Sequence, residues 1–538
     1  MNELFYGDNL DVLRKHIPDE SVDLIYLDPP FNSARAYNII FKDKTGKQAA
    51  SQIEAFGDTW TWTDETTHAY ADLMQSPLVP PQLKMTMEAF KSFMRLSDLM
   101  AYLTMMAIRL VELRRVLKES GSLYLHCDPT ASHYLKIILD QVFGQDNFRN
   151  EIIWKRTSSH GNVQKKCGAI HDTIFFYAKS KGSVWNQLYT NYDESYLKDF
   201  YKYTDENGRR YRLGDITAPM QRASKGQIYE WKGYKPGPNR CWVYAIDEME
   251  RLDQAGRLNY SKDGGGGVQY IRYLDEMQGV KLQDIWTDIR PVPSNEALGY
   301  PTQKPLALLE RVIQASSNEG AVVLDPFCGC GTAVVAAEKL GRKWIGIDIT
   351  YYAIGLVKKR LEDQYPGIRY AETGVPRSVE DAAHLAKTKP FQFESWAVSL
   401  IEAQPFKSSG GGDTGIDGLL FFKDYEGNHH RIIVEVKGGG YQPKDVRNLK
   451  QVMDRDSAPL GVLIALEEPT KGMRSIAAEF GFWKLPGGQA EYPVLQIFTM
   501  QDFFDGKRPK LPDTSGTLKD AKRIIREREK QPKLPGLE

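Results

Sequence analysis

The sequence has no long hydrophobic run and few cysteines. No stretch of about 18 apolar residues occurs, so we expect no membrane span. The start, "MNELFYGDNL", lacks a basic segment followed by an apolar core, so we expect no secretory signal. The five cysteines are an odd number scattered over a long chain, which argues against a disulfide framework. We therefore expect a cytoplasmic protein without a membrane partner.

An excess of charge of either sign is also lacking. Lys+Arg and Asp+Glu both number 70, so the formal net charge is zero and the chain does not look like a small basic DNA-binding domain. Nucleic acid is not excluded as a partner, because a large enzyme can gather its basic residues on one face. The phosphate-binding pattern G-x-x-x-x-G-K-[ST] is absent too, so ATP-driven translocation is not expected.

What the sequence does contain is an alternation of strand and helix patterns in two separate ranges. A chain of 538 residues should form several domains. Residues 1–150 include an apolar strand at 22–27, helical periodicity over 84–118 and the strand "SLYLHC", and the alternation returns at 291–365. This pattern predicts an α/β fold with a doubly wound, parallel sheet.

The other ranges differ in character. Residues 151–290 are rich in Tyr, Trp, Gly, Lys and Arg and look like an irregular insert. Residues 366–390 are polar and are expected to be a linker, and 391–510 contain a smaller α/β domain. The charged residues 511–538 read as a tail.

The first motif that carries chemistry is "VVLDPFCGCGT", at residues 322–332. Its strand ends at Asp325, and Gly329 and Gly331 allow a tight turn into a helix whose first N–H groups are free. A further strand ends at Asp348, about 20 residues later, where an acid can accept hydrogen bonds from ribose hydroxyls. The arrangement predicts a nucleoside cofactor, and the alternative is a tight turn with a chance aspartate.

The second motif is "YLDPPFNS", at residues 26–33. Asp28 follows an apolar strand, and the carbonyl of Pro29 is rigid because proline fixes its φ angle. Two such acceptors suit an exocyclic amino group, which has two N–H donors, and Phe31 can stack on the base that carries this group. A stiff loop capped by an aspartate is the alternative.

Together these residues resemble the beta-class amino-methyltransferases of DNA. Asp28, Pro29, Pro30 and Phe31 match the catalytic Asp-Pro-Pro-aromatic motif. The stretches "YGDNLDVL", "RRVLKESGSLYLHCD" and "YPTQKP" also match, and residues 20–180 look like the methylase subunits of type III restriction systems. The family's Phe-x-Gly-x-Gly loop binds S-adenosylmethionine, and the resemblance implies cofactor contacts from Asp8, Lys304, Asp325, Phe327, Gly329, Gly331, Thr332 and Asp348.

The resemblance implies a site-specific DNA methyltransferase acting on a flipped-out base. Asp28 favours N6 of adenine, whereas members acting on N4 of cytosine mostly have Ser at this position. The insert would recognise the target in double-stranded DNA, and a homodimer is compatible with this class. The candidate DNA contacts are Trp154, Lys155, Arg156, Lys165 and Lys166, and for each of them an ordinary surface role is the alternative.

A third motif lies in the C-terminal range, where "DTGIDG" precedes "VEVKG". Glu435 and Lys437 alternate along one strand and so share a face, and a hairpin would bring Asp417 to them. Two carboxylates form a hard oxygen site suited to Mg²⁺. The motif resembles the Mrr-like endonucleases of the PD-(D/E)xK clan, which implies that Asp417, Glu435 and Lys437 are catalytic, that Asp417 and Glu435 bind the metal, and that Glu394 adds an acidic group.

The combined expectation is a single-chain restriction–modification enzyme, an adenine-N6 methyltransferase joined to a Mg²⁺-dependent endonuclease. One alternative is a methyltransferase whose C-terminal domain only binds DNA. Another is a recognition subunit of a larger defence complex, with further restriction-system subunits as partners. A modification enzyme for RNA is a third.

Overall fold

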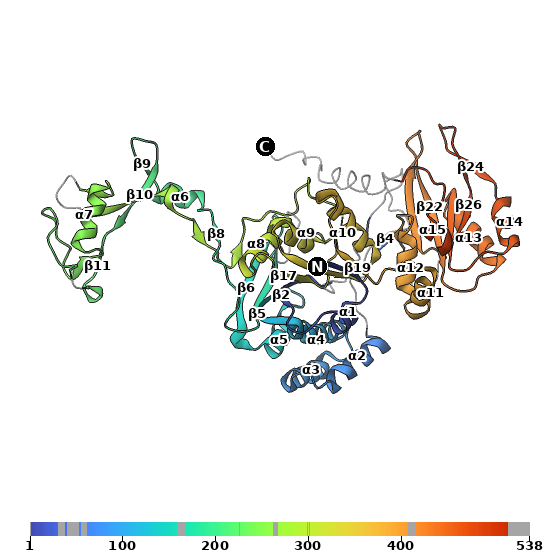
Figure 1. Cartoon of the computed structure of the whole chain (residues 1–538), viewed down its shortest axis with the longest axis horizontal. Helices are drawn as coiled ribbons and strands as arrows, with labels where there is room; N and C mark the ends of the chain where they lie inside the picture. The colour runs from blue at the N-terminus through green and yellow to red at the C-terminus, as the bar shows by residue number, and fades with distance from the viewer. Residues whose placement is uncertain are drawn as a thin grey trace. The chain divides into compact units, whose positions relative to one another are not determined.

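The computed structural model describes residues 2–30, 38–39, 53–54, 62–158, 167–224, 226–261, 267–298, 300, 302–406 and 415–514. Residues Gln187–Gln283 form a compact unit of their own, and the rest of the chain forms the other unit (Figure 1). Within the described ranges, no helix combines the length and the apolar character that crossing a membrane requires.

The larger unit is built on a nine-stranded sheet. Neighbouring strands run parallel except around β7, which is antiparallel to both β5 and β6. The expected doubly wound α/β sheet is therefore present, but it is mixed rather than all parallel. In spatial order the strands are β16 (Ile285–Trp286), β6 (Phe148–Lys155), β7 (His171–Ala178), β5 (Leu117–Cys127), β2 (Val22–Leu27), β17 (Val322–Asp325), β18 (Lys343–Asp348), β1 (Glu3–Tyr6) and β19 (Ala371–Thr373).

The two motif-bearing strands are direct neighbours in this sheet. β2 and β17 pair in parallel, with Leu24 opposite Val323 and Ile25 opposite Leu324. β5 lies on the other side of β2 and β18 on the other side of β17, so the strand order switches between them. In an open α/β sheet this is where a ligand crevice forms, at the carboxyl ends of the strands.

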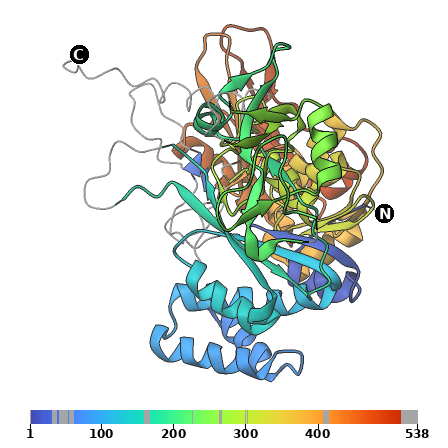
Figure 2. The same cartoon turned by 90° about the vertical axis from the view of Figure 1, so that its left-hand side faces the viewer.

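Helices cover both faces of the sheet. Figure 1 shows α4 and α5 on one side and α8, α9 and α10 on the other, and α2 and α3 lie on the outer side of α4 in Figures 1 and 2. The main hydrophobic core lies between the sheet and the α4 side, with side chains such as Leu13, Met106 and Leu125 fully buried. The helices are α1 (Asn9–His16), α2 (Asp64–Gln75), α3 (Pro81–Met94), α4 (Asp98–Val116), α5 (Ser132–Phe143), α8 (Leu306–Ser316), α9 (Thr332–Lys339) and α10 (Tyr351–Gln364).

The helical periodicity over 84–118 corresponds to two helices rather than one. The chain turns at Arg95, whose φ is 56°, and α4 then begins after Ser97. The Ser97 hydroxyl accepts a hydrogen bond from the backbone N–H of Met100 at 3.2 Å, which is the usual role of serine before a helix.

The smaller unit has its own core around Ile216, Trp231, Trp242 and Met249. It is shorter than the insert expected at 151–290, because β6, β7 and β16 belong to the main sheet. Its strands form the sheet β13 (Leu258–Tyr260), β14 (Val268–Tyr273), β10 (Arg210–Asp215) and β9 (Tyr203–Thr204) and the pairs β11 (Thr217–Pro219) with β12 (Arg240–Trp242) and β8 (Tyr189–Thr190) with β15 (Val280–Lys281), and its helices are α6 (Glu194–Phe200) and α7 (Ile246–Gln254).

The range expected to be a linker contains regular structure. β19 pairs with β1, and α11 (Val379–Thr388) begins after Ser378, whose hydroxyl accepts from the Asp381 N–H at 3.2 Å. The buried positions of α11 are Ala382 and Ala386, and its other residues are mostly polar or exposed. Small alanines give a weak apolar signal, so the sequence did not indicate this helix within the expected linker.

The C-terminal range forms a second mixed sheet. β22 (His429–Lys437) is antiparallel to β21 (Gly418–Lys423) and parallel to β23 (Leu460–Ala465), to which α13 (Pro443–Arg455) connects it. The expected tail from residue 515 onward lies outside the described residues. The other elements are α12 (Pro390–Ser399), β20 (Gln404–Pro405), α14 (Lys471–Glu479), β24 (Phe482–Lys484), β25 (Glu491–Pro493), β26 (Leu495–Thr499) and α15 (Met500–Phe504).

Candidate active site

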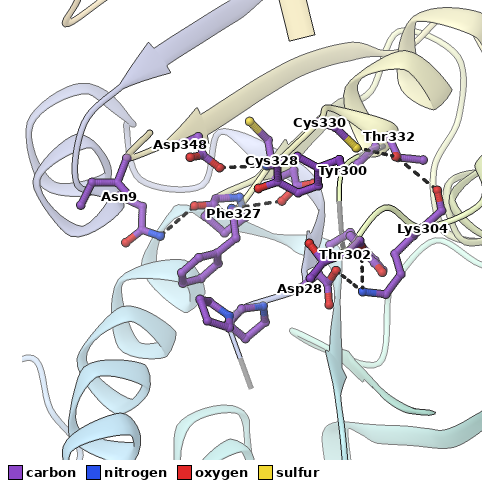
Figure 3. A pocket seen from close by; sticks show the side chains of 18 of the residues that line it. Asn9, Asp28, Tyr300, Thr302, Lys304, Phe327, Cys328, Cys330, Thr332 and Asp348 are labelled. Carbon is purple, nitrogen blue, oxygen red and sulfur yellow. Dashed lines mark hydrogen bonds and ion pairs between the residues drawn. The ribbon is translucent and has the colours of Figure 1, made fainter. Parts of the chain in front are cut away.

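A cavity of about 410 Å³ opens at the carboxyl ends of β2 and β17 (Figure 3). Its lining residues come from stretches that are far apart in the sequence, chiefly 7–9, 26–30, 302–304 and 325–333, with Arg109, Tyr300 and Asp348 among the others. The strand order brings the two motifs of the sequence to one crevice.

Asp28 points into this crevice with its two carboxylate oxygens in different states (Figure 3). Oδ2 forms an ion pair with the ammonium of Lys304, and the two side chains are only 15% and 10% exposed. Oδ1 is buried and accepts no hydrogen bond from any residue in the described ranges. A buried carboxylate oxygen without a donor is costly, so this atom is suited to receive a donor from a ligand. Phe31 lies outside the described residues.

The glycine loop between β17 and α9 is held tightly from behind. Gly331 has φ of 75°, and a Cβ placed on it would lie 2.8 Å from a methyl carbon of Val357. The N–H of Cys328 donates to the carbonyl of Ile347 at 3.0 Å. The glycine pattern therefore serves both the left-handed backbone and the close packing of α10.

Asp348 links this loop to the end of the neighbouring strand. Its Oδ2 accepts from the Gly329 N–H at 2.9 Å, and its Oδ1 accepts from the N–H and the hydroxyl of Thr350, both at 2.8 Å. Burial raises the pKa of this carboxyl above its usual range. Asp348 lines the cavity, but its contacts show a loop-organising role, and a contact with ribose stays a prediction.

Asp325 is the most strongly perturbed acid of the crevice. Burial, reinforced by the negative charges of Asp28 and Asp348, raises its pKa well above the usual range. Its Oδ1 accepts from the N–H of Phe327 at 3.1 Å. Among the described residues, four aspartates line the cavity, namely Asp8, Asp28, Asp325 and Asp348, beside the cations Arg109 and Lys304. Their oxygens offer hydrogen-bond acceptors to the ammonium and the ribose hydroxyls of a nucleoside cofactor. In this respect the residues present fit S-adenosylmethionine.

Asp8 also lines the cavity, directly before the first residue of α1. It accepts from the N–H of Leu10 at 2.8 Å, and both of its oxygens accept from the guanidinium of Arg109, at 3.0 and 2.8 Å. Asn9 accepts from Arg109 at 2.5 Å and donates to the Pro326 carbonyl at 2.7 Å. The sequence reasoning missed Arg109 and Asn9. An arginine inside the apolar helix "LTMMAIRLVEL" was the available signal.

Lys304 and Thr332 connect the two sides of the site. The Thr332 hydroxyl donates to the backbone carbonyl of Lys304 at 3.3 Å. Lys304 also forms a direct ion pair with Asp28, which the sequence did not reveal. Its contact with the cofactor stays a prediction.

The candidate DNA contacts in β6 fare less well. Trp154 is 3% exposed, and its indole N–H donates to the Ile289 carbonyl at 3.1 Å, so it is a core residue and not a DNA contact. Arg156 lies 3.3 Å from Asp172, and Lys155 is exposed. Alternation along β6 explains the error, since the pattern "IIWK" places the tryptophan inward. Lys165 and Lys166 lie outside the described residues.

The C-terminal candidates do come together. The Asp417 carboxylate accepts from the Val436 N–H at 2.6 Å, and Lys437 pairs with Glu435 at 2.7 Å. Each carboxylate thus has one oxygen engaged within the protein. Within the described ranges, no cluster of three or more His, Cys, Asp or Glu side chains could hold a metal ion. Glu394 lies in α12 and is partly buried.

Comparison with known proteins decides the family of the larger part. Residues 22–359 match the DNA methylase family. The chain belongs to this family. The methylase domain is similar to the type II methyltransferase M.EcaI of Enterobacter cloacae, with 29% identity over 73% of this chain and 77% of that protein. It is also similar to the DNA adenine methyltransferase YhdJ of Escherichia coli, with 25% identity over 67% of this chain and 82% of that protein.

The chain is also similar to a solved methyltransferase structure, and its C-terminal range matches a second family. The cytosine-N4-specific PvuII DNA methyltransferase matches 69% of this DNA methylase and 89% of its own chain, at 13% identity and a TM-score of 0.32. Residues 393–505 match a family described as NACHT-associated inactive Restriction Endonuclease 1. The restriction-endonuclease-like character of this range is thus supported. An inactive family argues against the expected nuclease and its Mg²⁺.

Proposed function

We propose that this DNA methylase is a site-specific, S-adenosylmethionine-dependent methyltransferase that modifies N6 of adenine in double-stranded DNA. The observation that carries the proposal is the buried, unsatisfied Oδ1 of Asp28, next to Pro29 at the wall of the cavity. An exocyclic amine presents two N–H donors, and the Asp28 Oδ1 and Pro29 carbonyl are two acceptors for them.

The residues of the chain act by orientation and by exclusion of water. Lys304 fixes Asp28 by occupying its other oxygen, so the amine is held with its lone pair directed into the cavity. When bound, the cofactor supplies an electrophilic methyl group on a sulfonium. The target base must leave the duplex to reach the crevice, which costs a few kcal/mol of stacking and pairing.

Adenine is favoured over cytosine for two reasons. The first residue of the motif is Asp28, which within the resembling class goes mostly with adenine. The similarity to an adenine methyltransferase points the same way. Mass spectrometry of nucleosides from treated DNA tests this choice, because N6-methyladenine and N4-methylcytosine have different masses.

For the remaining parts we propose recognition without cutting. The unit Gln187–Gln283 would read the target site, and the C-terminal domain would bind DNA. The match to a family described as inactive supports this assignment over an active endonuclease.

The decisive experiment is transfer of a labelled methyl group to duplex DNA by the full chain and by Asp28→Ala. We expect the variant to lose at least about 1,000-fold in rate, because the carboxylate that accepts from the target amine and orients it is removed. Its affinity for the cofactor, measured by calorimetry, should equal that of the full chain. Loss of both methyl transfer and cofactor binding would mean that Asp28 belongs to the cofactor site. Adding duplex RNA as a competitor tests whether DNA is the preferred substrate.

A further inference from the structure

A chain of buried polar side chains runs from the cavity across three neighbouring strands, β2, β5 and β7, and ends at Arg156, directly after β6. The Tyr26 hydroxyl lies 2.8 Å from His126 Nδ1, and His126 Nε2 lies 3.1 Å from Asp172 Oδ2. Arg156 Nε lies 3.3 Å from the other oxygen of Asp172. None of these contacts is needed to hold the cofactor loop, so the chain calls for a separate explanation.

Strand register places the chain directly beside Asp28. Tyr26 is the next-to-last residue of β2, Asp28 follows directly after the strand, and both line the cavity. Tyr26 is opposite Tyr124 in β5, and His126 follows two residues later on the same face of β5. The next strand, β7, contributes Asp172. Polar side chains from successive strands thus line up at the carboxyl edge, where the amine is expected.

Burial fixes the direction of the hydrogen bonds. Tyr26 and Asp172 are each 2% exposed and His126 is 0% exposed, while Tyr26 is also part of the cavity wall. The carboxylate of Asp172 can only accept, so His126 Nε2 carries the hydrogen and Nδ1 accepts from the phenol. A hydroxyl, an imidazole and a carboxylate in this order can remove a proton from a group that contacts the hydroxyl.

We propose that Tyr26, His126 and Asp172 form a relay that takes up the proton lost by the target amine. The inference rests on the proposed methyl transfer. The amine lone pair forms the new N–C bond, and the electron pair of the broken S–C bond stays on the sulfur. The amine nitrogen then gives one hydrogen as a proton to Tyr26 Oη, while Tyr26 passes its own proton to His126 Nδ1. The resulting imidazolium is stabilised by Asp172.

The surroundings of the relay support this direction of transfer. Burial, with the nearby charges of Asp28, Asp325 and Asp172, raises the pKa of Tyr26 well above its usual range, so the phenol is not a base by itself and must donate as it accepts. Burial opposes ionisation of Asp172, but His126, Arg156 and Lys304 together lower its pKa below the usual value. Asp172 is therefore an anion facing the imidazole.

The other groups near the amine are less suited to receive the proton. The Pro29 carbonyl is a weak base, and Asp28 already holds the ammonium of Lys304 on one oxygen. The relay resets when the methylated base leaves, because Tyr26 then contacts water in the cavity and His126 returns the proton through it.

The test is the pH dependence of the single-turnover rate of methyl transfer by the full chain and by Tyr26→Phe. The matched control is Tyr124→Phe, because Tyr124 is equally buried, lies opposite Tyr26, and donates or accepts at 2.7 Å with Ser316 away from the cavity. We expect Tyr26→Phe to be about 100-fold slower than the wild type and to differ from it in pH profile. Tyr124→Phe should match the wild type in both rate and profile.

Two further measurements separate the relay from a structural role. Cofactor binding, and base flipping followed by 2-aminopurine fluorescence, should be unchanged in Tyr26→Phe. Asp172→Asn should also be slower than the wild type, because the imidazolium that forms during the transfer loses its anion. It therefore also serves as the test if Tyr26→Phe does not fold. A wild-type rate and profile in both variants would overturn the relay. A wild-type chain that transfers no methyl group would instead overturn the proposed function.

Discussion

Lys304 and Asp28 form a nearly buried ion pair between residues 276 positions apart in the sequence. The backbone carbonyl of Lys304 in turn accepts from Thr332, the first residue of α9. The group proposed to hold the amine is therefore joined, through one side chain and its own backbone, to the loop proposed to hold the cofactor. The ion pair therefore fixes the position of the amine site relative to the cofactor loop.

The first prediction concerns this ion pair. Lys304→Met should lower the free energy of unfolding by about 3 kcal/mol, because removing one partner leaves an uncompensated, nearly buried carboxylate. Asp28→Asn combined with Lys304→Met should cost less than the sum of the single changes. Chemical denaturation of the four proteins gives the coupling free energy directly.

Lys358→Met is the control for that cycle. Lys358 pairs with Glu372 at 2.8 Å, but these side chains are 36% and 22% exposed. Ion pairs that are open to solvent typically contribute about 1 kcal/mol or less. Equal costs for Lys304→Met and Lys358→Met would contradict the view that burial makes the Asp28 pair special.

The second prediction uses the raised pKa of Asp325. Because the folded protein holds this proton more tightly than the unfolded chain, whose ordinary value is 3.8, the free energy of unfolding should fall as pH rises above about 4. Asp325→Asn removes this cost. We expect the variant to have a free energy of unfolding at pH 7 that is at least about 1 kcal/mol higher than that of the wild type, since one pKa unit corresponds to about 1.4 kcal/mol. Its melting temperature should be higher accordingly.

The pH series is what distinguishes this effect from simple repacking. The advantage of Asp325→Asn should be small near pH 4 and should grow towards neutral pH. A constant difference across the series would assign the gain to packing instead. Cofactor affinity measured on the same samples should fall, because an amide replaces one of the aspartates that line the cavity.

The strand-and-helix pattern predicted most of the methylase core, and for a physical reason. Apolar strands such as β2 and β18 have the expected bounds because both faces of a covered sheet must be apolar. Most of β6 and all of β7 fall within the range 151–290, which was assigned to the insert for its content of Tyr, Trp, Gly, Lys and Arg. In the structure both strands belong to the main sheet, where Asp172 of β7 contacts His126 of β5 and Arg156.

Contacts between distant segments could not be read from the sequence. The pairing of Lys304 with Asp28 and of Arg109 with Asp8 depends on strand order and helix packing, which no local pattern encodes. For the C-terminal motif, the sequence predicted the proximity of the residues but not whether they are active. Its residues come together, yet two carboxylates and a lysine do not by themselves specify a working metal site, and the family match argues against one.

The third prediction addresses that C-terminal domain. Lys437→Ala should leave the rate of methyl transfer within about twofold of wild type, because Lys437 pairs with Glu435 and is not part of the cavity wall. Wild-type protein incubated with unmethylated DNA, Mg²⁺ and no ATP should yield no discrete fragments. Fragments that disappear in Lys437→Ala would restore the endonuclease interpretation.

The fourth prediction concerns the unit Gln187–Gln283, which leaves the larger unit through a paired ribbon. Thr190 in β8 is opposite Val280 in β15. Replacing residues 191–279 by Asn-Gly should close this ribbon with a two-residue hairpin turn, for which that dipeptide is well suited. The larger unit keeps its anchors at both ends, since the Asn186 N–H donates to Ala315 at 2.7 Å and Asp284 accepts from Ile153 at 2.8 Å.

We expect the shortened protein to fold, because the core around Trp231, Trp242 and Met249 is removed as a whole and is separate from the core under the main sheet. It should bind the cofactor as the full chain does and should lose at least about 100-fold in methyl transfer to its site, since base contacts contribute about 1–3 kcal/mol each. Sequencing of methylated adenines shows whether the residual activity has lost its site preference. Retention of both the rate and the site by the shortened protein would place target recognition elsewhere in the chain, with the C-terminal domain as the next segment to remove.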